Sequence, residues 1–399
     1  MNLKLVLFYI IAFIVLYTEP IQVGPVSFGI LWKIIAVFLL TLPMLYESLK
    51  SKQMELFAVL YFAFAVKTLF NYTSFEYPME AITIAVKIAM SPLLYLFFMK
   101  VPKETLLFIA KHYALAIILI FIPYHFGLIE PLGEGYNLSI YYLDGQFGLV
   151  GPFLSPHAAS ISLAMAMVII TLQINAKNSS ILNLFYLSIL VLGFYQLVMT
   201  YVRTGIAIYL TSLMYLYLQN FNFKKLLLMI ITASLLIGIG AYLVSTSEVA
   251  KMRFEDRHKY AQHDGVGSGR LLYWSSAIKN WTNDEDIVLL VGLGYTYGRQ
   301  KMKESVGLEI FAHNEFIQML QQEGLIGFTL FLGSLLALIN YIKRYRQSQY
   351  YRHSMAVFIA MITMMMFQGG FYFNVVVFLF IYLALQKKEI LEKDSDAKN

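Results

Sequence analysis

Three residues in polar stretches of the chain have side chains suited to binding phosphate or moving a proton. Arg203 lies in the stretch TYVRTG, Arg270 lies in SGRLLYWSSAIKNW, and His313 opens HNEFIQMLQQEGLIGF. An arginine guanidinium binds phosphate oxygens in bidentate fashion and stays charged when partly desolvated. An imidazole can take or give a proton near neutral pH. Together the three suit a site that binds phosphate groups and deprotonates an attacking hydroxyl.

Each of these residues also has a purely structural interpretation. Arg270 could extend from an interfacial helix into the lipid headgroups, and Arg203 could do so from a helix cap. His313 could be an interfacial histidine whose hydrogen bonds are satisfied. A catalytic role for His313 is favoured by its neighbours Asn314 and Glu315 and by its place where a polar segment re-enters an apolar one. Asn314 and Glu315 are therefore candidates to line the site.

Other polar residues are weaker candidates. His157, in GPFLSPHAAS, is a further candidate to line the site, although a loop histidine beside Pro156 is an equally simple interpretation. Glu134 and Asp144 could contact sugars, but their spacing does not require it. His258 and His263 lack the i, i+4 spacing of metal ligands on a helix.

We expect neither a metal nor a cofactor. The chain contains no cysteine, which excludes disulfides, thiolate nucleophiles and cysteine-ligated metals. The stretch VGLGYTYG differs from the dinucleotide-binding fingerprint and lacks a surrounding βαβ unit. We predict no nucleic-acid partner.

The composition indicates a membrane protein. Of 399 residues, 59% are hydrophobic and 14% are charged, whereas ordinary soluble domains carry about 25% charged residues. The mean hydropathy is +0.65. The N-terminal apolar run has no small-residue cleavage site before Glu19, so we expect a retained first span.

Runs long and apolar enough to cross a bilayer predict an all-α polytopic fold. There are twelve such runs, near residues 3–18, 26–46, 54–70, 80–99, 106–123, 152–174, 181–200, 204–219, 224–245, 324–342, 354–369 and 371–386. They divide the chain into spans one to nine (1–245), a polar loop (246–323), spans ten to twelve (324–386) and a charged tail (387–399), which we expect to be frayed.

The distribution of lysine and arginine predicts the orientation of the spans. If Met1 is cytoplasmic, the inside loops carry nearly all basic residues of the short loops, while the outside stretches TEPIQVGP and NYTSFEYPME carry none. Both termini are then cytoplasmic and the 246–323 loop faces the periplasm or the exterior. Arg203 is the exception in a short outward loop, and such a charge often marks a functional site.

The polar loop should contain helices that lie along the membrane interface. Leu271, Trp274, Ile278 and Trp281 recur at helical spacing after Ser268, a candidate N-cap, and this pattern places Arg270 in the first turn. A second amphipathic segment runs from His313 through Gly324 into the tenth span.

Three lysines fall inside predicted spans, where an ammonium group must be paired or face water. We expect carboxylates near the outer ends of the spans to pair with them, with binding of lipid phosphate as the alternative. The lysines are Lys33, Lys67 and Lys87, and the carboxylates are Glu19, Glu76 and Glu80.

Four motifs in order, TYVRTG, SGRLLYW, VGLGYTYG and HNEFIQMLQQEGLIG, resemble the O-antigen ligase and polymerase family over about residues 196–340. The resemblance implies a metal-independent, inverting glycosyltransferase with a multi-helix membrane core of the GT-C-like kind. It implies an undecaprenyl-diphosphate-linked oligosaccharide as donor, used at the periplasmic face of the bacterial inner membrane. By motif match, Arg203 and Arg270 bind the diphosphate, and His313 activates or positions the acceptor.

The motifs leave the acceptor open. The RTG and GLGYTYG forms favour a polymerase that extends surface polysaccharide, and the alternative is a ligase that transfers the glycan to lipid A core. A flippase and a chain-length regulator are expected partners. A transporter or flippase for lipid-linked sugars is the competing class, although no inverted repeat is visible. A non-catalytic subunit of an export machine is a third.

Overall fold

The computed structural model describes residues 54–129, 148–153, 155–174, 178–219, 270–368 and 373–396, with isolated positions between 22 and 50 and between 234 and 245. The first, second and ninth predicted spans lie largely outside the described residues. So do most of the first part of the polar loop and the predicted positions Ser268, Lys33, Glu134, Asp144, His258 and His263.

The described part is helical, apart from a two-stranded antiparallel ladder of β1 (Gln22–Val23) and β2 (Val26–Ser27). The helices before the polar loop are α3 (Leu56–Thr68), α4 (Pro78–Lys100), α5 (Lys103–Leu119), α6 (Phe121–His125), α7 (Pro156–Thr171), α8 (Ser180–Met199) and α9 (Arg203–Leu218). The later helices are α12 (Arg270–Thr282), α13 (Asp286–Val291), α14 (Tyr295–Val306), α15 (Glu315–Arg344), α16 (Tyr351–Phe367) and α17 (Phe373–Asp396).

Four described helical segments are long and apolar enough to cross a membrane: Pro78–Lys100, Lys103–His125, Ser180–Met199 and Glu315–Arg344. Three shorter apolar helices, α3, α7 and α16, coincide with predicted spans. The described residues thus agree with the predicted helical class and include four candidate membrane spans, while the count of twelve spans stays a prediction.

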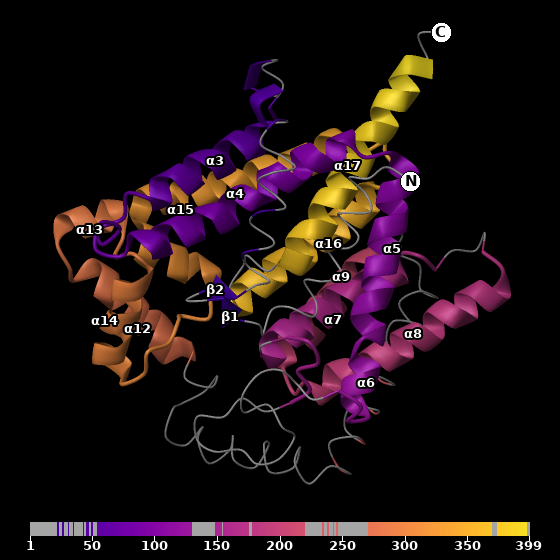
Figure 1. The fold of residues 1–399 in the computed structure, drawn as a ribbon, viewed down its shortest axis with the longest axis horizontal. Coiled ribbons are helices and arrows are strands. Elements are labelled where there is room, and N and C mark those ends of the chain that lie inside the picture. Colours follow the sequence, from indigo (N-terminus) through magenta and orange to yellow (C-terminus); the bar gives the residue numbers. More distant parts are fainter. Residues whose placement is uncertain are drawn as a thin grey trace.

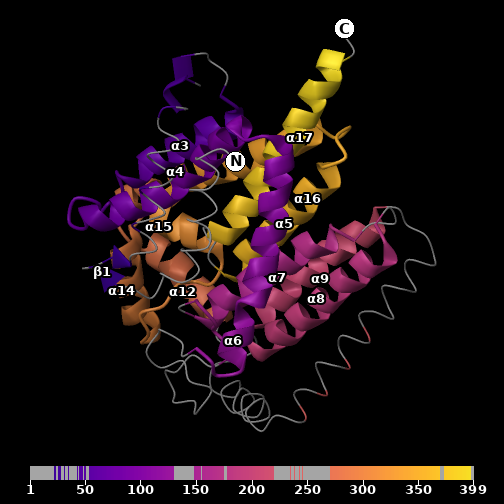
Figure 2. The ribbon, with the colours of Figure 1, turned by 45° about the vertical axis from the view of Figure 1, so that its right-hand side comes forward.

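The helices form two connected groups (Figures 1 and 2). In one group, α3 packs against α4 and α15, and α4 packs against α17. In the other, α7 packs against α5, α8 and α9, while α16 joins the groups by contacting both α9 and α15. Residues 159–170 of α7 are all buried, which makes α7 a central helix. The helices α12, α13 and α14 gather at one end of α15 (Figure 1).

The C-terminal segment differs from its prediction as a frayed tail. Helix α17 continues to Asp396. The carboxylate of Glu389 accepts hydrogen bonds from the Ser348 hydroxyl (2.5 Å) and the Gln349 backbone N–H (2.9 Å), and it pairs with Lys393 at 2.9 Å. These contacts tie the charged segment to the α15–α16 connection, and the i, i+4 ion pair supports the helix.

Helix α15 begins before the predicted tenth span and has a break within it. The predicted run from the His313 motif through Gly324 is present, but Gly324 adopts φ 63° and ψ −172°. The break separates a short first half, residues 315–323, from the long apolar half that follows.

Candidate active site

All four predicted site residues with a basic or titratable nitrogen lie at or next to a helix N-terminus. His157 is the second residue of α7, Arg203 is the first residue of α9, and Arg270 is the first described residue of α12. His313 lies two residues before α15. The positive ends of the helix dipoles therefore lie next to these side chains.

Capping side chains explain where two of these helices begin. The Ser155 hydroxyl accepts a hydrogen bond from Ala158 N–H (3.2 Å) at the start of α7, where Pro156 occupies the first turn. The Asn314 side chain accepts from Phe316 N–H (3.0 Å) and Ile317 N–H (3.2 Å) at the start of α15. Asn314 thus caps the helix that follows His313.

Two residues at the site have backbones that non-glycine residues rarely adopt. Tyr201 has φ 54° and His313 has φ 51°, and among the described residues no other non-glycine residue has a positive φ. Such conformations occur at functional sites more often than elsewhere. The turn at Tyr201 is fixed by a hydrogen bond from Leu149 N–H to Met199 C=O of 2.8 Å. This turn leads directly to Arg203.

The structure brings His313, Arg270, Arg203 and His157 together. The ring centroids of His157 and His313 are 6.4 Å apart and the rings are nearly parallel. Burial lowers the pKa of His313 to about 4, and the positive charge of Arg270 adds to this. Burial also lowers the pKa of Arg270, and the charge of Arg203 contributes. His313 is therefore neutral at pH 7, beside the guanidinium group of Arg270, which in turn has that of Arg203 nearby.

Two aromatic residues complete the surroundings of the site. The ring centroids of Tyr273 and His313 are 6.4 Å apart. The guanidinium carbon of Arg270 lies 5.7 Å from the centroid of Phe367, at the end of α16. Tyr273 lies three residues after Arg270, which places it on the same face of α12. Phe367 had no signal in the sequence.

Glu315 is the first residue of α15 and lies near Tyr295 of α14. Its side chain is buried. Burial raises the pKa of Tyr295 in α14, and the negative charge of Glu315 contributes to the rise. Glu315 therefore neighbours Tyr295, and the predicted role of Glu315 as a site-lining residue stays a prediction. Among the described residues, no three His, Asp or Glu side chains are grouped as metal ligands.

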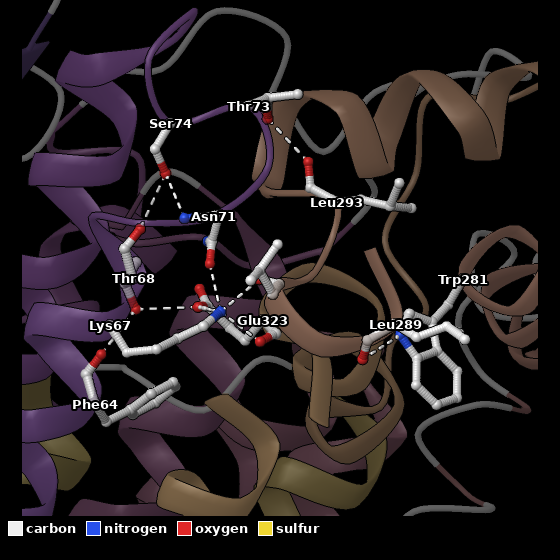
Figure 3. A network of polar contacts seen from close by, with 11 residues as sticks. Phe64, Lys67, Thr68, Asn71, Thr73, Ser74, Trp281, Leu289, Leu293 and Glu323 are labelled. Atoms are coloured by element: carbon white, nitrogen blue, oxygen red, sulfur yellow. Dashed lines mark hydrogen bonds and ion pairs between the residues drawn. The ribbon is translucent and has the colours of Figure 1, made fainter. Parts of the chain in front are cut away.

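Lys67 does not pair with Glu76 or Glu80 as predicted. Its ammonium lies 3.0 Å from the carboxylate of Glu323 in α15 (Figure 3). Glu80 instead accepts a hydrogen bond from the backbone N–H of Thr296 at 3.2 Å, at the start of α14. The prediction was wrong because Glu323 is remote in sequence but adjacent in the fold.

Residues 188–332 match a protein-family model described as O-antigen ligase. The matched segment runs from α8 into α15 and contains Arg203, Arg270 and His313. A search of curated proteins gives no match for the chain. The match confirms the resemblance predicted from the four motifs. Residues 188–332 are therefore similar to O-antigen ligases, and four described helical segments are long and apolar enough to cross a membrane.

Proposed function

We propose that the protein transfers a glycan from undecaprenyl diphosphate to an acceptor hydroxyl at the periplasmic face of the bacterial inner membrane. The observation that carries this proposal is the convergence of Arg203, Arg270 and neutral His313, from three separate segments, at the N-termini of α9, α12 and α15. A glycosyl transfer from a diphosphate needs groups that bind the leaving diphosphate and a group that accepts the proton of the acceptor hydroxyl. The arginines supply the first function and the histidine supplies the second.

Arg203 and Arg270 bind the diphosphate in this proposal. Two guanidinium groups offer paired N–H donors to the phosphate oxygens. The N-terminus of α9 adds partial positive charge at the same place. These groups stabilise the charge that develops on the departing diphosphate, so no metal ion is required for that role.

His313 acts as the general base. Its neutral imidazole accepts the proton of the acceptor hydroxyl while the hydroxyl oxygen attacks the anomeric carbon. The bond between that carbon and the diphosphate oxygen breaks, and undecaprenyl diphosphate leaves with the electron pair. Attack opposite the leaving group inverts the anomeric configuration. The nearby rings of His157 and Tyr273 line the acceptor side of the site.

Twelve spans with cytoplasmic termini and a periplasmic 246–323 loop fit this chemistry. The distribution of lysine and arginine in the loops supports this orientation. The donor lipid then reaches the site sideways from the bilayer, past the α12 helix. The exposed apolar side chains of α12, Leu271, Leu272 and Ile278, suit contact with acyl or prenyl chains.

We favour a polymerase that joins repeat units of a surface polysaccharide. Transfer to lipid A core is the second candidate, because the matched family model is described as O-antigen ligase. The two differ only in the acceptor, and the donor site is the same in both.

The test is a transfer assay with purified protein in nanodiscs, a radiolabelled undecaprenyl-diphosphate repeat unit and excess EDTA. The proposal predicts lipid-linked chains of several repeats, and their loss in His313→Ala but not in His112→Ala, a partly buried histidine of α5. Products only upon addition of lipid A core would identify a ligase. Absence of transfer to either acceptor, in EDTA or with added Mg²⁺, would refute the proposed function.

A further inference from the structure

Lys67, near the end of α3, is held by four oxygen atoms. Its ammonium donates to the side chain of Asn71 (2.5 Å), to the backbone carbonyl of Val291 (2.6 Å) and to both the backbone carbonyl and the carboxylate of Glu323 (Figure 3). The carboxylate also accepts from the Thr68 hydroxyl at 3.2 Å. The side chains of Lys67 and Glu323 are 9% and 2% exposed. A buried ion pair persists only when its remaining hydrogen-bonding groups are satisfied in this way.

This network lies at the break in α15. Because Gly324 interrupts the helix, the carbonyls of Gln321 and Gln322 accept hydrogen bonds from the backbone N–H groups of Leu293 and Gly294, each at 3.0 Å. The first half of α15, residues 315–323, is therefore fastened at its end to the 291–294 turn and to Lys67. We call these contacts, made by Lys67, Glu323 and the 291–294 turn, the Lys67 clasp.

The clasp requires a very close approach of two backbones. A Cβ atom on Gly324 would lie 2.4 Å from the carbonyl oxygen of Leu290, and one on Gly292 would lie 2.3 Å from that of Gln322. Both glycines also have positive φ, 63° and 83°. The backbones of the motifs VGLG and EGLIG are thus in direct contact with each other.

The half-helix fastened by the clasp directly follows the proposed catalytic histidine. His313 immediately precedes its cap, Asn314. The helix α12, which begins at Arg270, packs against α15. The position of His313 relative to Arg203 on α9 therefore depends on how the first half of α15 is set against the bundle.

We propose that Lys67 and Glu323 are positioning residues for the transfer reaction. They fix the direction of the first half of α15 and so hold His313 and Arg270 in register with Arg203. For its activity readout, this inference rests on the proposed glycosyl transfer. It accounts for a lysine inside an apolar helix without assigning that lysine to the substrate.

The test separates positioning from stability by comparing Lys67→Met with the double variant Lys67→Met/Glu323→Met. The single change leaves a buried carboxylate without its cation and lowers both the unfolding midpoint and kcat. The double change removes both charges and should restore the midpoint, because apolar replacement of a buried pair is often neutral or stabilising. Its kcat should stay about tenfold or more below wild type, with a smaller change in KM for the donor, because small misplacements of a catalytic group cost rate. Recovery of kcat together with the midpoint would overturn the proposal.

Two glycines with left-handed backbones provide a matched control. A Cβ atom on Gly307 (φ 76°) meets no atom within 4 Å, whereas one on Gly324 meets the Leu290 carbonyl. Gly324→Ala should lower kcat at least as much as the double variant does, and Gly307→Ala should leave kcat within about twofold of wild type. Equal kcat values for the two alanine variants would contradict the role of the clasp.

Amide hydrogen exchange tests the clasp without any activity. The amides of Leu293 and Gly294 should be protected in the wild type and exchange at least tenfold faster in the double variant. Unchanged protection would refute the clasp, whereas a wild-type protein with no transfer activity would refute the proposed function and leave this result intact.

Discussion

Two cationic side chains next to the α12–α14 helices, those of Lys67 and Arg270, have opposite electrostatic surroundings. Lys67 is enclosed by oxygen acceptors, including the carboxylate of Glu323. Arg270 is influenced by the like charge of Arg203, and among the described residues no salt bridge reaches Arg270. The charge of Lys67 is neutralised internally and serves the structure. Among the described residues, the charge of Arg270 is not neutralised by a carboxylate, in contrast to that of Lys67.

The largest expected effect is a loss of transfer rate when the proposed base, His313, is removed. His313→Ala should reduce the transfer rate about 10²-fold to 10⁴-fold, the usual contribution of general-base catalysis. The variant should keep its unfolding midpoint, because no charge is left unpaired. Initial rates in nanodiscs, with His112→Ala as the control, measure the effect. A rate within threefold of wild type would show that the proton is taken by another group.

The next largest effect is a difference in the free energy of unfolding between variants of Lys67 and of Arg270. Lys67→Met should lower the free energy of unfolding by about 3–5 kcal/mol, because it leaves the buried carboxylate of Glu323 without its partner. Arg270→Met should cost little, because it removes a positive charge beside Arg203. Denaturation of both variants in detergent measures the difference. Comparable losses in the two variants would mean that Arg270 has a structural role like that of Lys67.

Conservative changes at the arginines should have a smaller effect. Arg203→Lys and Arg270→Lys keep the charge but lose the planar pair of donors. We expect a decrease of about 10-fold to 100-fold in kcat/KM, below the 10²–10³ typical for complete removal of a transition-state donor. Arg299→Lys on α14, which alters an ion pair with Glu309, is the matched control. Full activity in both site variants would argue against bidentate binding.

The smallest effect is a shift of the pH profile. Because the pKa of His313 is lowered to about 4, the base is neutral well below pH 6.5 and activity should fall only as the pH approaches 4. In Arg270→Met, loss of the neighbouring positive charge should raise the pKa of His313 and move the acidic limb upward by less than about one unit. Assays at low pH, followed by return to pH 7 to exclude denaturation, measure both. A wild-type midpoint near 6.5 would contradict the burial of His313.

Local patterns predicted much of the fold. The helices α3, α4, α8, α9 and α16 lie within a few residues of predicted apolar runs, because length and hydropathy alone mark a span. The spacing of Leu271, Trp274 and Ile278 also predicted α12, with Arg270 in its first turn. The helical tail to Asp396 was missed, because its stability comes from contacts of Glu389 with the α15–α16 connection.

The residue types of the candidate site could be predicted from the sequence, but the contacts that hold the surrounding helices in place could not. Arg203, Arg270 and His313 were found because their chemistry is unusual beside apolar segments. The pairing of Lys67 with Glu323 was not, since nothing local links residues so far apart in sequence. The available signals were a lysine in an apolar run and glycines in VGLG and EGLIG, which in hindsight mark a close contact between backbones.

The most direct test of the central claim is the affinity of purified variants for undecaprenyl diphosphate, the product that carries only the diphosphate and the lipid. We predict that Arg203→Lys/Arg270→Lys weakens binding at least tenfold, while His313→Ala binds within twofold of wild type although it no longer transfers glycan. Equal affinity of the arginine variant and the wild type would contradict a diphosphate site formed by Arg203 and Arg270.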